Sequence, residues 1–394
     1  MTTTTPTLPF DRPDPMEAPP AYARLRGRAP VAPVLTPDGQ PAWLVTSYET
    51  VATVLSDRRF GLAPPGAAFP GNDTLFQDGE AHTRLRRLVS KAFTPRSLVV
   101  LRPRIERLAA GYVSAVADTG PPADLVAGLA TPLSITVISE LLGVAIDERE
   151  RFRGLADAAS AADFVFGTEE DMTVATKAWN ELGGYAAAMI ASKREEPGDD
   201  LLSTLIAVRD TDGERLADTE LVAMIATIVS AGYLSVRNAI SVGAIRLLTE
   251  GRLAYLAAAA PEQVDATVEE VLRMQSGRTG EPFPRYAHED LELAGVSISA
   301  GDLVLVRLEA AHRDPGHFAD PDRFVPERLS SPPLVFGHGP HYCLGASLAR
   351  IEVGAALSAL ARRLPGLRLQ GPVDRIEWTG NAVDIGPTAL HVTW

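Results

Sequence analysis

The segment from Phe336 to Gly345 constrains the fold and chemistry of this chain more than any other part of the sequence. It reads Phe-Gly-His-Gly-Pro-His-Tyr-Cys-Leu-Gly and holds Cys343, the single cysteine among 394 residues. A lone thiol cannot form a disulfide within the chain, and glycines permit backbone angles that other residues avoid. The run that follows predicts a helix, whose first N–H groups and dipole would lie beside the sulfur. These surroundings favour a thiolate, which acts either as a nucleophile or as a metal ligand.

Composition and charge exclude several classes of protein. The chain is 46% hydrophobic and 22% charged, as is usual for a soluble globular protein. Its net charge of −13 argues against a nucleic-acid partner, which would require a basic face. The N-terminus lacks the basic and apolar regions of a signal peptide. The most apolar run, 221–234, is shorter than the about 20 residues that span a membrane. We therefore expect a cytoplasmic protein with no membrane anchor, and one cysteine fits that reducing compartment.

Periodicity along the chain predicts a mainly helical fold. Apolar residues recur at helical spacing over 81–93, 97–117, 130–143, 175–194, 219–249 and 262–275. Short strand-like segments lie at 43–47, 291–293, 296–298, 303–306 and 390–394, whereas 60–79 and 310–335 read as irregular. No linker divides the chain. We expect a proline-rich arm at 1–20, followed by one large mainly α domain at 21–394 with small β-sheets.

Two further pairs of residues fall at helical spacing. Glu270 and Arg273 are three residues apart, so they can pair on one helix face. His82 and Arg86 are four residues apart and would present donors on one face, which suits a carboxylate. Taken alone, the first pair is an ordinary solvated ion pair and the second an ordinary basic face.

Together these motifs resemble the cytochrome P450 family. Its haem-binding loop has the pattern Phe-x-x-Gly-x-His-x-Cys-x-Gly, which Phe336, Gly339, His341, Cys343 and Gly345 match at every fixed position. The resemblance implies the cytochrome P450 fold and haem b with the Cys343 thiolate as axial ligand of its iron. Such a thiolate pushes electron density toward iron and promotes O–O cleavage.

The same resemblance implies roles for other residues of this sequence. The haem propionates would be held by His82, Arg86, Arg285 and His341, and the loop under the haem would include Phe336, Gly337 and Gly345. A buried network behind the haem, needed for folding and not for chemistry, would be formed by Glu270, Arg273 and Arg328.

The helix expected at 219–249 departs from the family in one place. Cytochromes P450 carry Ala/Gly-Gly-x-Asp/Glu-Thr over the haem, and the corresponding residues here are 231–235, Ala-Gly-Tyr-Leu-Ser. Gly232 and Ser235 fit a catalytic role, but Leu234 stands in place of the acid that relays protons. Either water and Ser235 rebuild the relay, or proton delivery is altered with help from substrate or from another side chain. Glu281 is the first candidate for that side chain and Glu309 a weaker one.

The resemblance also implies a substrate pocket and partners. We expect pocket residues at Phe164, Phe166, Val229, Tyr233, Arg278, Glu281, Phe283 and Val383. Electrons would come from a ferredoxin and a ferredoxin reductase, because no reductase module is attached. A basic patch of Arg84, Arg87, Lys91 and Arg350 could dock an acidic ferredoxin. The sequence does not indicate an oligomeric state.

Several functions remain open for such a chain. The first is a monooxygenase that hydroxylates or epoxidises a natural-product intermediate, in the style of actinobacterial secondary metabolism. An alternative is oxidative C–C or C–N coupling of an aromatic or cyclic dipeptide-like substrate without oxygen insertion, and a third is a non-catalytic haem sensor. A zinc site would need about four ligands. A cysteine nucleophile would need a base, for which His341 is close, but the other motifs have no role in that scheme.

Overall fold

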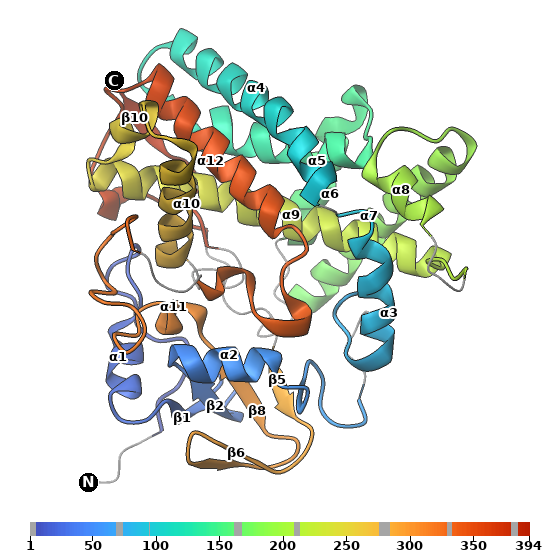
Figure 1. Cartoon of the computed structure of the whole chain (residues 1–394), viewed down its shortest axis with the longest axis vertical. Coiled ribbons are helices and arrows are strands. Elements are labelled where there is room, and N and C mark those ends of the chain that lie inside the picture. The colour runs from blue at the N-terminus through green and yellow to red at the C-terminus, as the bar shows by residue number, and fades with distance from the viewer. Residues whose placement is uncertain are drawn as a thin grey trace.

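The computed structural model describes residues 5–67, 74–93, 95–160, 168–208, 213–275, 284–328, 333–379 and 385–394, without the side chains of 95–99 and 160. A helical part and a smaller part built on a β-sheet lie side by side, and the chain leading to α12 (Ala346–Arg363) passes between them (Figure 1). The mainly α fold expected from periodicity is confirmed.

One long helix organises the helical part. This helix, α9 (Asp218–Thr249), packs against the helices α5, α6, α7, α10 and α12, while α4 packs against α12. The bounds of the helices around it are α3 (Gly79–Ser90), α4 (Pro95–Thr119), α5 (Thr131–Leu142), α6 (Arg149–Ser160), α7 (Glu169–Glu195), α8 (Leu201–Ala207) and α10 (Pro261–Gln275).

The two halves of α9 belong to different hydrophobic cores. Its first half, from Leu221 to Tyr233, packs in a core with residues of α3, α5, α6, α7 and α8. Its second half, from Val236 to Leu247, packs in another core with residues of α4, α10 and α12. Burial on almost every side explains why this helix is apolar along its whole length.

Among the described residues, α9 is also the one helix long and apolar enough to cross a membrane. It lies at the centre of the fold with other helices around it (Figure 1), so its apolar character is accounted for by the two cores.

The main sheet has five strands in the order β1–β2–β8–β5–β3. Their bounds are β1 (Val31–Leu35), β2 (Pro41–Val45), β8 (Leu303–Val306), β5 (Arg285–Ala287) and β3 (Phe60–Gly61). β1 and β2 form an antiparallel hairpin, in whose turn Gly39 has a φ of 85°. Alternate residues of the strands point to opposite faces of the sheet. One face packs against α1 (Pro20–Arg26) and the other against α2 (Tyr48–Ser56).

Two smaller sheets complete the β structure. The strands β4 (Ala123–Asp124), β10 (His391–Thr393) and β9 (Arg368–Leu369) form one, and β6 (Leu291–Leu293) pairs with β7 (Val296–Ile298) in the other. These strands agree with the short strand-like segments expected near residues 291, 296 and 390.

Most of the helices missing from the expected list are short, although α6 is as long as the expected helices α3 and α5. The missing helices are α1, α2, α6, α8 and α11 (Leu308–Ala311), of which the longest, α6, has 12 residues. A helix of two or three turns repeats its apolar pattern too few times to be recognised, and its stability comes mostly from packing. The segment 310–335, expected to be irregular, begins inside α11.

The proline-rich residues before α1 lie along the sheet. The N–H of Leu8 donates to the carbonyl of Leu35 and the N–H of Leu35 to Pro6, both at 2.9 Å. Further along, Glu17 accepts from two arginines that are themselves almost buried: Arg246 of α9 at 2.9 Å and Arg313, after α11, at 3.0 Å. One carboxylate therefore ties the arm to the end of α9 and to the coil after α11.

Replacing Glu17 with alanine should lower the free energy of unfolding by about 1–3 kcal/mol, because two buried guanidinium groups lose a charged acceptor. Urea unfolding followed by circular dichroism measures this. Glu148→Ala, which removes an exposed pair with Arg151, is the matched control and should change stability by less than about 0.5 kcal/mol. An equal loss of stability in Glu17→Ala and Glu148→Ala would show that the ion pairs of Glu17 do not hold the arm on the fold.

Candidate active site

The cysteine loop is seated on α2. Gly337 and Gly339 have φ values of 76° and 72°, in the region that favours glycine. A Cβ on Gly339 would lie 2.8 Å from the Cα of Ser56 and 2.9 Å from the carbonyl of Leu55, so no larger residue fits there. The loop closes when the N–H of Cys343 donates to the carbonyl of Phe336 at 2.8 Å. The sequence pattern of glycines therefore reflects both backbone angle and close contact.

Cys343 lies three residues before α12, as expected, and its side chain is exposed. The backbone N–H groups of Gly345 and Ala346 bond toward the sulfur. Although Cys343 keeps exposed surface, the protein atoms around its sulfur raise the pKa of the thiol by desolvation, and those N–H groups with the charges of Arg86 and Arg350 offset this only in part. The direction is opposite to the one that the helix terminus alone would give.

Four residues expected to face carboxylates, His82, Arg86, Arg285 and His341, come from three separate segments around this loop. The rings of His82 and His341 lie 4.3 Å apart, and Nε2 of His82 is buried with no hydrogen-bond partner among the described residues. Arg86 donates to the carbonyl of Tyr342 at 2.6 Å, next to the cysteine. Arg285 is buried on β5 and bonds Pro284 at 3.3 Å. Burial, together with the charges of His341 and Arg86, lowers the pKa of His82 to about 4.

Asp78 joins this group, although the sequence analysis did not name it. Its Oδ1 lies 2.9 Å from Nε2 of His341, and its Oδ2 accepts the N–H of Leu62 at 2.7 Å. Burial would raise the pKa of Asp78, but these two bonds and the charge of Arg285 hold it below its ordinary value. The sequence signal that could have identified Asp78 is its position just before α3, where an aspartate is a preferred N-cap residue.

The middle of α9 has one side that is not filled by core. From Met224 to Leu247 every side chain is buried except those at 230–232, 234, 235 and 237. At 3.6 residues per turn, Ser230, Ala231, Leu234, Ser235 and Arg237 share one side of the helix. We call these five residues the α9 window. An exposed residue such as Ala231, at the centre of a core helix, shows that this side borders open space.

Two predicted active-site residues, Leu234 and Ser235, belong to the window. Leu234 is half-buried, and the Ser235 hydroxyl donates to the carbonyl of Ala231 at 2.5 Å. The third, Gly232, is half-buried beside the window, and a Cβ there would lie 3.4 Å from Cδ1 of Ile138 in α5. The small size of Gly232 therefore serves the contact with α5, whereas Ala231 faces the open side.

The expected pocket residues Val229 and Tyr233 do not face the window. Val229 is 0% exposed and Tyr233 1% exposed, and both belong to the core of the first half of α9. They lie on the side of the helix opposite Ala231 and Ser235, where Tyr233 hydrogen-bonds Asp157 of α6. Burial and the charge of Asp157 raise the pKa of Tyr233 to about 12. The pocket prediction for these two residues is corrected accordingly.

Glu270, Arg273 and Arg328 come together as expected. Arg273 donates to both oxygens of Glu270, at 2.7 and 2.9 Å, and both side chains are almost fully buried. Nε of Arg328 lies 3.5 Å from Glu270. The remaining donors of Arg273 bond the carbonyls of His312, Pro321 and Arg323 at 2.6, 2.8 and 3.2 Å. One arginine thus pins the coil between α11 and the cysteine loop onto α10.

Comparisons with known proteins agree with this arrangement. The cytochrome P450 family model matches residues 262–372. The chain is 38% identical to nocardicin C N-oxygenase of Nocardia uniformis subsp. tsuyamanensis, covering 100% of this chain and 99% of that protein. It is 40% identical to cytochrome P450 monooxygenase PikC of Streptomyces venezuelae, over 95% and 90% of the two chains. The solved structure of the LnmA cytochrome P450 hydroxylase of Streptomyces atroolivaceus has a TM-score of 0.89 at 38% identity, covering 99% and 100%.

The chain belongs to the cytochrome P450 family. It is a cytochrome P450 monooxygenase, and membership implies a haem–thiolate iron cofactor. The residues of this P450 fit that group. The thiol of Cys343 is exposed near the start of a helix, and the window leaves one side of α9 open. The buried Nε2 of His82 has no partner in the part of the chain that the structure describes.

Six predicted pocket residues of this P450, Phe164, Phe166, Arg278, Glu281, Phe283 and Val383, lie outside the described residues. Glu309, the weaker candidate for proton delivery, is buried on α11 and pairs with Arg12 of the N-terminal arm at 2.7 Å. Because Arg12 already compensates the charge of Glu309, we do not propose Glu309 as the residue that delivers protons.

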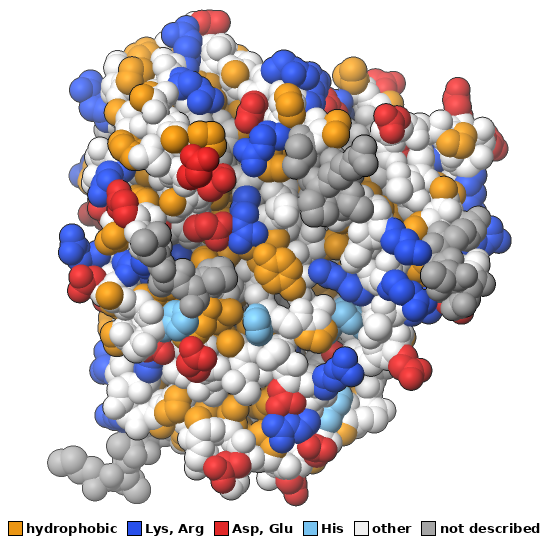
Figure 2. All heavy atoms as spheres, viewed as in Figure 1, with side chains coloured by type: hydrophobic (Ala, Val, Ile, Leu, Met, Phe, Trp, Pro, Cys, Tyr) orange, Lys and Arg blue, Asp and Glu red, His pale blue; other side chains and the backbone are white. Residues whose placement is uncertain are grey.

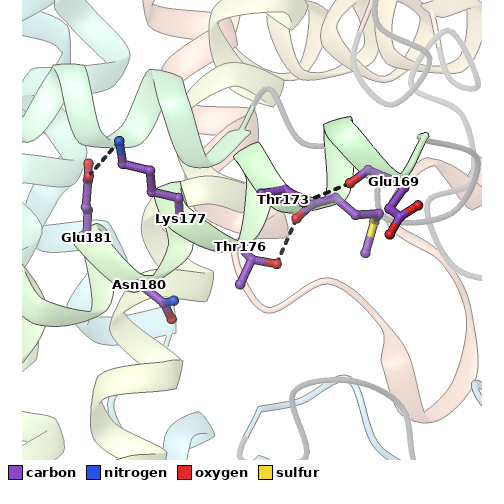
Figure 3. Close-up of a pocket in the computed structure, with 7 residues that line it drawn as sticks. Glu169, Thr173, Thr176, Lys177, Asn180 and Glu181 are labelled. Atoms are coloured by element: carbon purple, nitrogen blue, oxygen red, sulfur yellow. Dashed lines mark hydrogen bonds and ion pairs between the residues drawn. The ribbon is translucent and has the colours of Figure 1, made fainter.

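Two surface hollows of this P450 lie apart from the cysteine loop. One of about 640 Å³ is lined by residues of α7 alone, where Lys177 pairs with Glu181 and Thr173 bonds the carbonyl of Glu169 (Figure 3). The other, about 680 Å³, lies between α6 and α7 and is lined by residues such as Arg151 and Tyr185. Neither includes a residue of the window or of the cysteine loop.

Proposed function

We propose that this P450 binds haem b through the Cys343 thiolate and hydroxylates or epoxidises a natural-product intermediate. The observation that carries the proposal is an exposed thiol at the start of α12, in a molecule whose central helix has one open side. The names of its relatives support the substrate class: mycinamicin IV hydroxylase/epoxidase of Micromonospora griseorubida is 40% identical. We place the enzyme in the cytoplasm, where ferredoxin and its reductase would supply electrons.

The residues around the loop would position the cofactor. His82, Arg86, Arg285 and His341 provide donors for two propionates, and Asp78 fixes the ring of His341 by its bond to Nε2. When bound, the haem would supply an iron able to activate dioxygen. Cys343 would hold that iron through its sulfur, toward which the N–H groups of Gly345 and Ala346 are directed.

At the window, the hydroxyl of Ser235, next to Leu234, can donate and accept a proton. It donates to the carbonyl of Ala231 and keeps its oxygen lone pairs available. Leu234 excludes water from the neighbouring position and cannot donate or accept a proton. We therefore propose that protons reach the site through Ser235 and water, without a carboxylate at position 234.

Replacing Leu234 with aspartate should change the fraction of consumed electrons that appears in product several-fold, because it adds a titratable group beside Ser235. Oxygen uptake, peroxide and product are measured together under turnover. Leu234→Asn is the matched control, since asparagine has nearly the same shape as aspartate but does not titrate. Unchanged oxygen uptake and product yield in Leu234→Asp would show that the relay does not depend on this position.

Two of the four residues predicted to dock a ferredoxin, Arg84 and Arg350, form ion pairs within the chain. Arg84 pairs with Glu214 and Glu220, and Arg350 pairs with Glu269 while its guanidinium lies 4.4 Å from the ring of Phe336. Basic side chains nevertheless gather over and beside α3 on the face shown in Figure 2. We propose that an acidic ferredoxin docks on this face, where Arg87 and Lys91 are exposed.

Oxidative coupling remains the second candidate. A solved structure of SgvP, a proposed thioether synthase in griseoviridin tailoring, has a TM-score of 0.89 at 37% identity. The absence of an acid at position 234 favours a substrate whose own N–H or O–H assists proton flow.

Candidate metabolites are first titrated against the haem spin-state band, and those that bind are incubated with a reductase system. A mass gain of one oxygen supports the monooxygenase, a loss of hydrogens supports coupling, and binding without any product supports a sensor.

A further inference from the structure

Arg237 is a cation of the α9 window that has not been given a role. With Ser230 and Leu234 it forms a stripe at i, i+4 and i+7 of α9, and all three are half-buried. A guanidinium carries five N–H donors. In the part of the chain that the structure describes, its one acceptor is the carbonyl of Pro387, at 3.0 Å from Nη2. Its Nε is buried and has no hydrogen-bond partner among those residues.

Three other largely buried arginines of this P450, Arg246, Arg273 and Arg313, each have a carboxylate. Arg246, two and a half turns further along the same helix, pairs with Glu17 and Glu250. Arg273 pairs with Glu270, and Arg313 pairs with Glu17 and Asp322. Burying a charge without a partner is costly, so this pattern is expected of a stable fold. Arg237 has no carboxylate of the described residues within ion-pair distance. The same holds for buried Arg307, which bonds the carbonyl of Val306, and buried Arg285 bonds the carbonyl of Pro284, but of these three arginines only Arg237 belongs to the α9 window.

The acid with the strongest claim on Arg237 is already engaged. Asp157 of α6 and Arg237 both act on the hydroxyl of Tyr233 through their charges. Asp157, however, pairs with Arg153 at 3.3 Å and accepts the hydrogen bond of Tyr233. Arg237 also anchors the turn around Pro387, but that bond uses one donor and leaves the charge uncompensated.

We propose that Arg237 binds a carboxylate of the substrate at the edge of the α9 window. The proposal rests on the proposed function and narrows its substrate to acidic natural-product intermediates. A planar guanidinium matches a carboxylate with two parallel N–H donors, which fixes orientation as well as adding affinity. The position of Arg237, two residues after Ser235, would hold the anionic end of the substrate beside the site of oxidation.

A spectroscopic titration tests this without knowledge of the natural substrate. The probes are ω-(imidazol-1-yl)alkanoic acids of increasing chain length and their methyl esters, added to the purified haem-loaded enzyme. The imidazole nitrogen binds the iron and shifts the haem absorbance band, whichever group terminates the chain. At the chain length that spans from iron to Arg237, the acid should bind about tenfold or more tightly than its ester, as expected for a charge-assisted bond.

Three variants make the test specific. Arg237→Gln should lose the preference for the acid, and Arg237→Lys should keep part of it because the positive charge remains. Arg104 is an exposed arginine of α4 that pairs with Glu140. The Arg104→Gln variant should keep the full preference for the acid. Since the acid is compared with its own ester within each variant, a disturbance of the Pro387 turn affects both probes and leaves their ratio informative.

The outcomes separate the inference from the proposed function. Equal binding of acid and ester at every chain length, or a preference that survives in Arg237→Gln, overturns the role of Arg237. If no imidazole shifts the haem band at any length, the haem–thiolate site itself is refuted. A tenfold preference that disappears only in the Arg237→Gln variant supports a carboxylate-bearing substrate.

Discussion

Replacing Cys343 with serine should abolish the carbon monoxide absorbance band after which cytochromes P450 are named, and product formation should fall below detection. The reason is that a serine hydroxyl at this position cannot supply the electron-rich axial thiolate. Reduced, carbon monoxide-saturated protein is compared with wild type at equal protein concentration. The loop itself should persist, because its closing bond from the N–H of residue 343 to Phe336 involves backbone atoms only.

Tyr342→Phe is the control for this experiment. Tyr342 is adjacent to Cys343, and its hydroxyl lies 3.3 Å from Arg350 on the exposed side of the loop. This variant should keep the absorbance band, since the carbonyl that accepts from Arg86 is unchanged. A band of full height in Cys343→Ser would mean that another group ligates the iron. The proposal that Cys343 holds the haem would then be wrong.

Replacing Arg273 with alanine should lower the free energy of unfolding by about 3–5 kcal/mol, the usual cost of leaving a buried charge unpaired. Glu270 would lose two bonds, and the carbonyls of His312 and Pro321 would lose their donor. The coil leading to the cysteine loop would then be free to leave α10, so haem retention should fall together with stability. Urea unfolding of the haem-loaded protein, followed by circular dichroism and by haem absorbance, reports both.

An exposed arginine of the same region provides the comparison. Arg323 pairs with Asp320 at 3.7 Å, and both side chains are largely in solvent. Arg323→Ala should therefore change the free energy of unfolding by less than about 0.5 kcal/mol. Glu270→Gln, which keeps the size of the side chain, should reproduce most of the loss seen in Arg273→Ala. If Arg273→Ala unfolds like Arg323→Ala, the network does not hold the coil.

The parts of the site that follow from local sequence were predictable. The glycines of the cysteine loop, and the pairing of Glu270 with Arg273 at i, i+3, depend on neighbours within a few residues. The side of α9 that carries Val229 and Tyr233 was also accessible. Counting 100° per residue places these two residues opposite Ala231 and Ser235. The prediction of Val229 and Tyr233 as pocket residues did not take this into account.

Other features depend on contacts between distant segments, which periodicity cannot supply. Asp78 bonds His341 across 263 residues, and Arg84 pairs with Glu220 across 136. The pKa of Cys343 depends on how much protein surrounds the sulfur, so a helix N-terminus in the sequence gives only the smaller contribution. The short helices α6 and α8 depend in the same way on the core that they pack against.

The α9 window coincides with the joint between the two hydrophobic cores, since one core ends at Tyr233 and the other begins at Val236. A ligand lodged there would touch the boundary of both cores and add contacts that the folded chain alone lacks there. Its binding should consequently raise the thermal midpoint of the whole molecule, because a ligand that binds only the native state stabilises it by mass action. Libraries of metabolites could thus be sorted by melting temperature alone, before any electron donor for the enzyme has been identified.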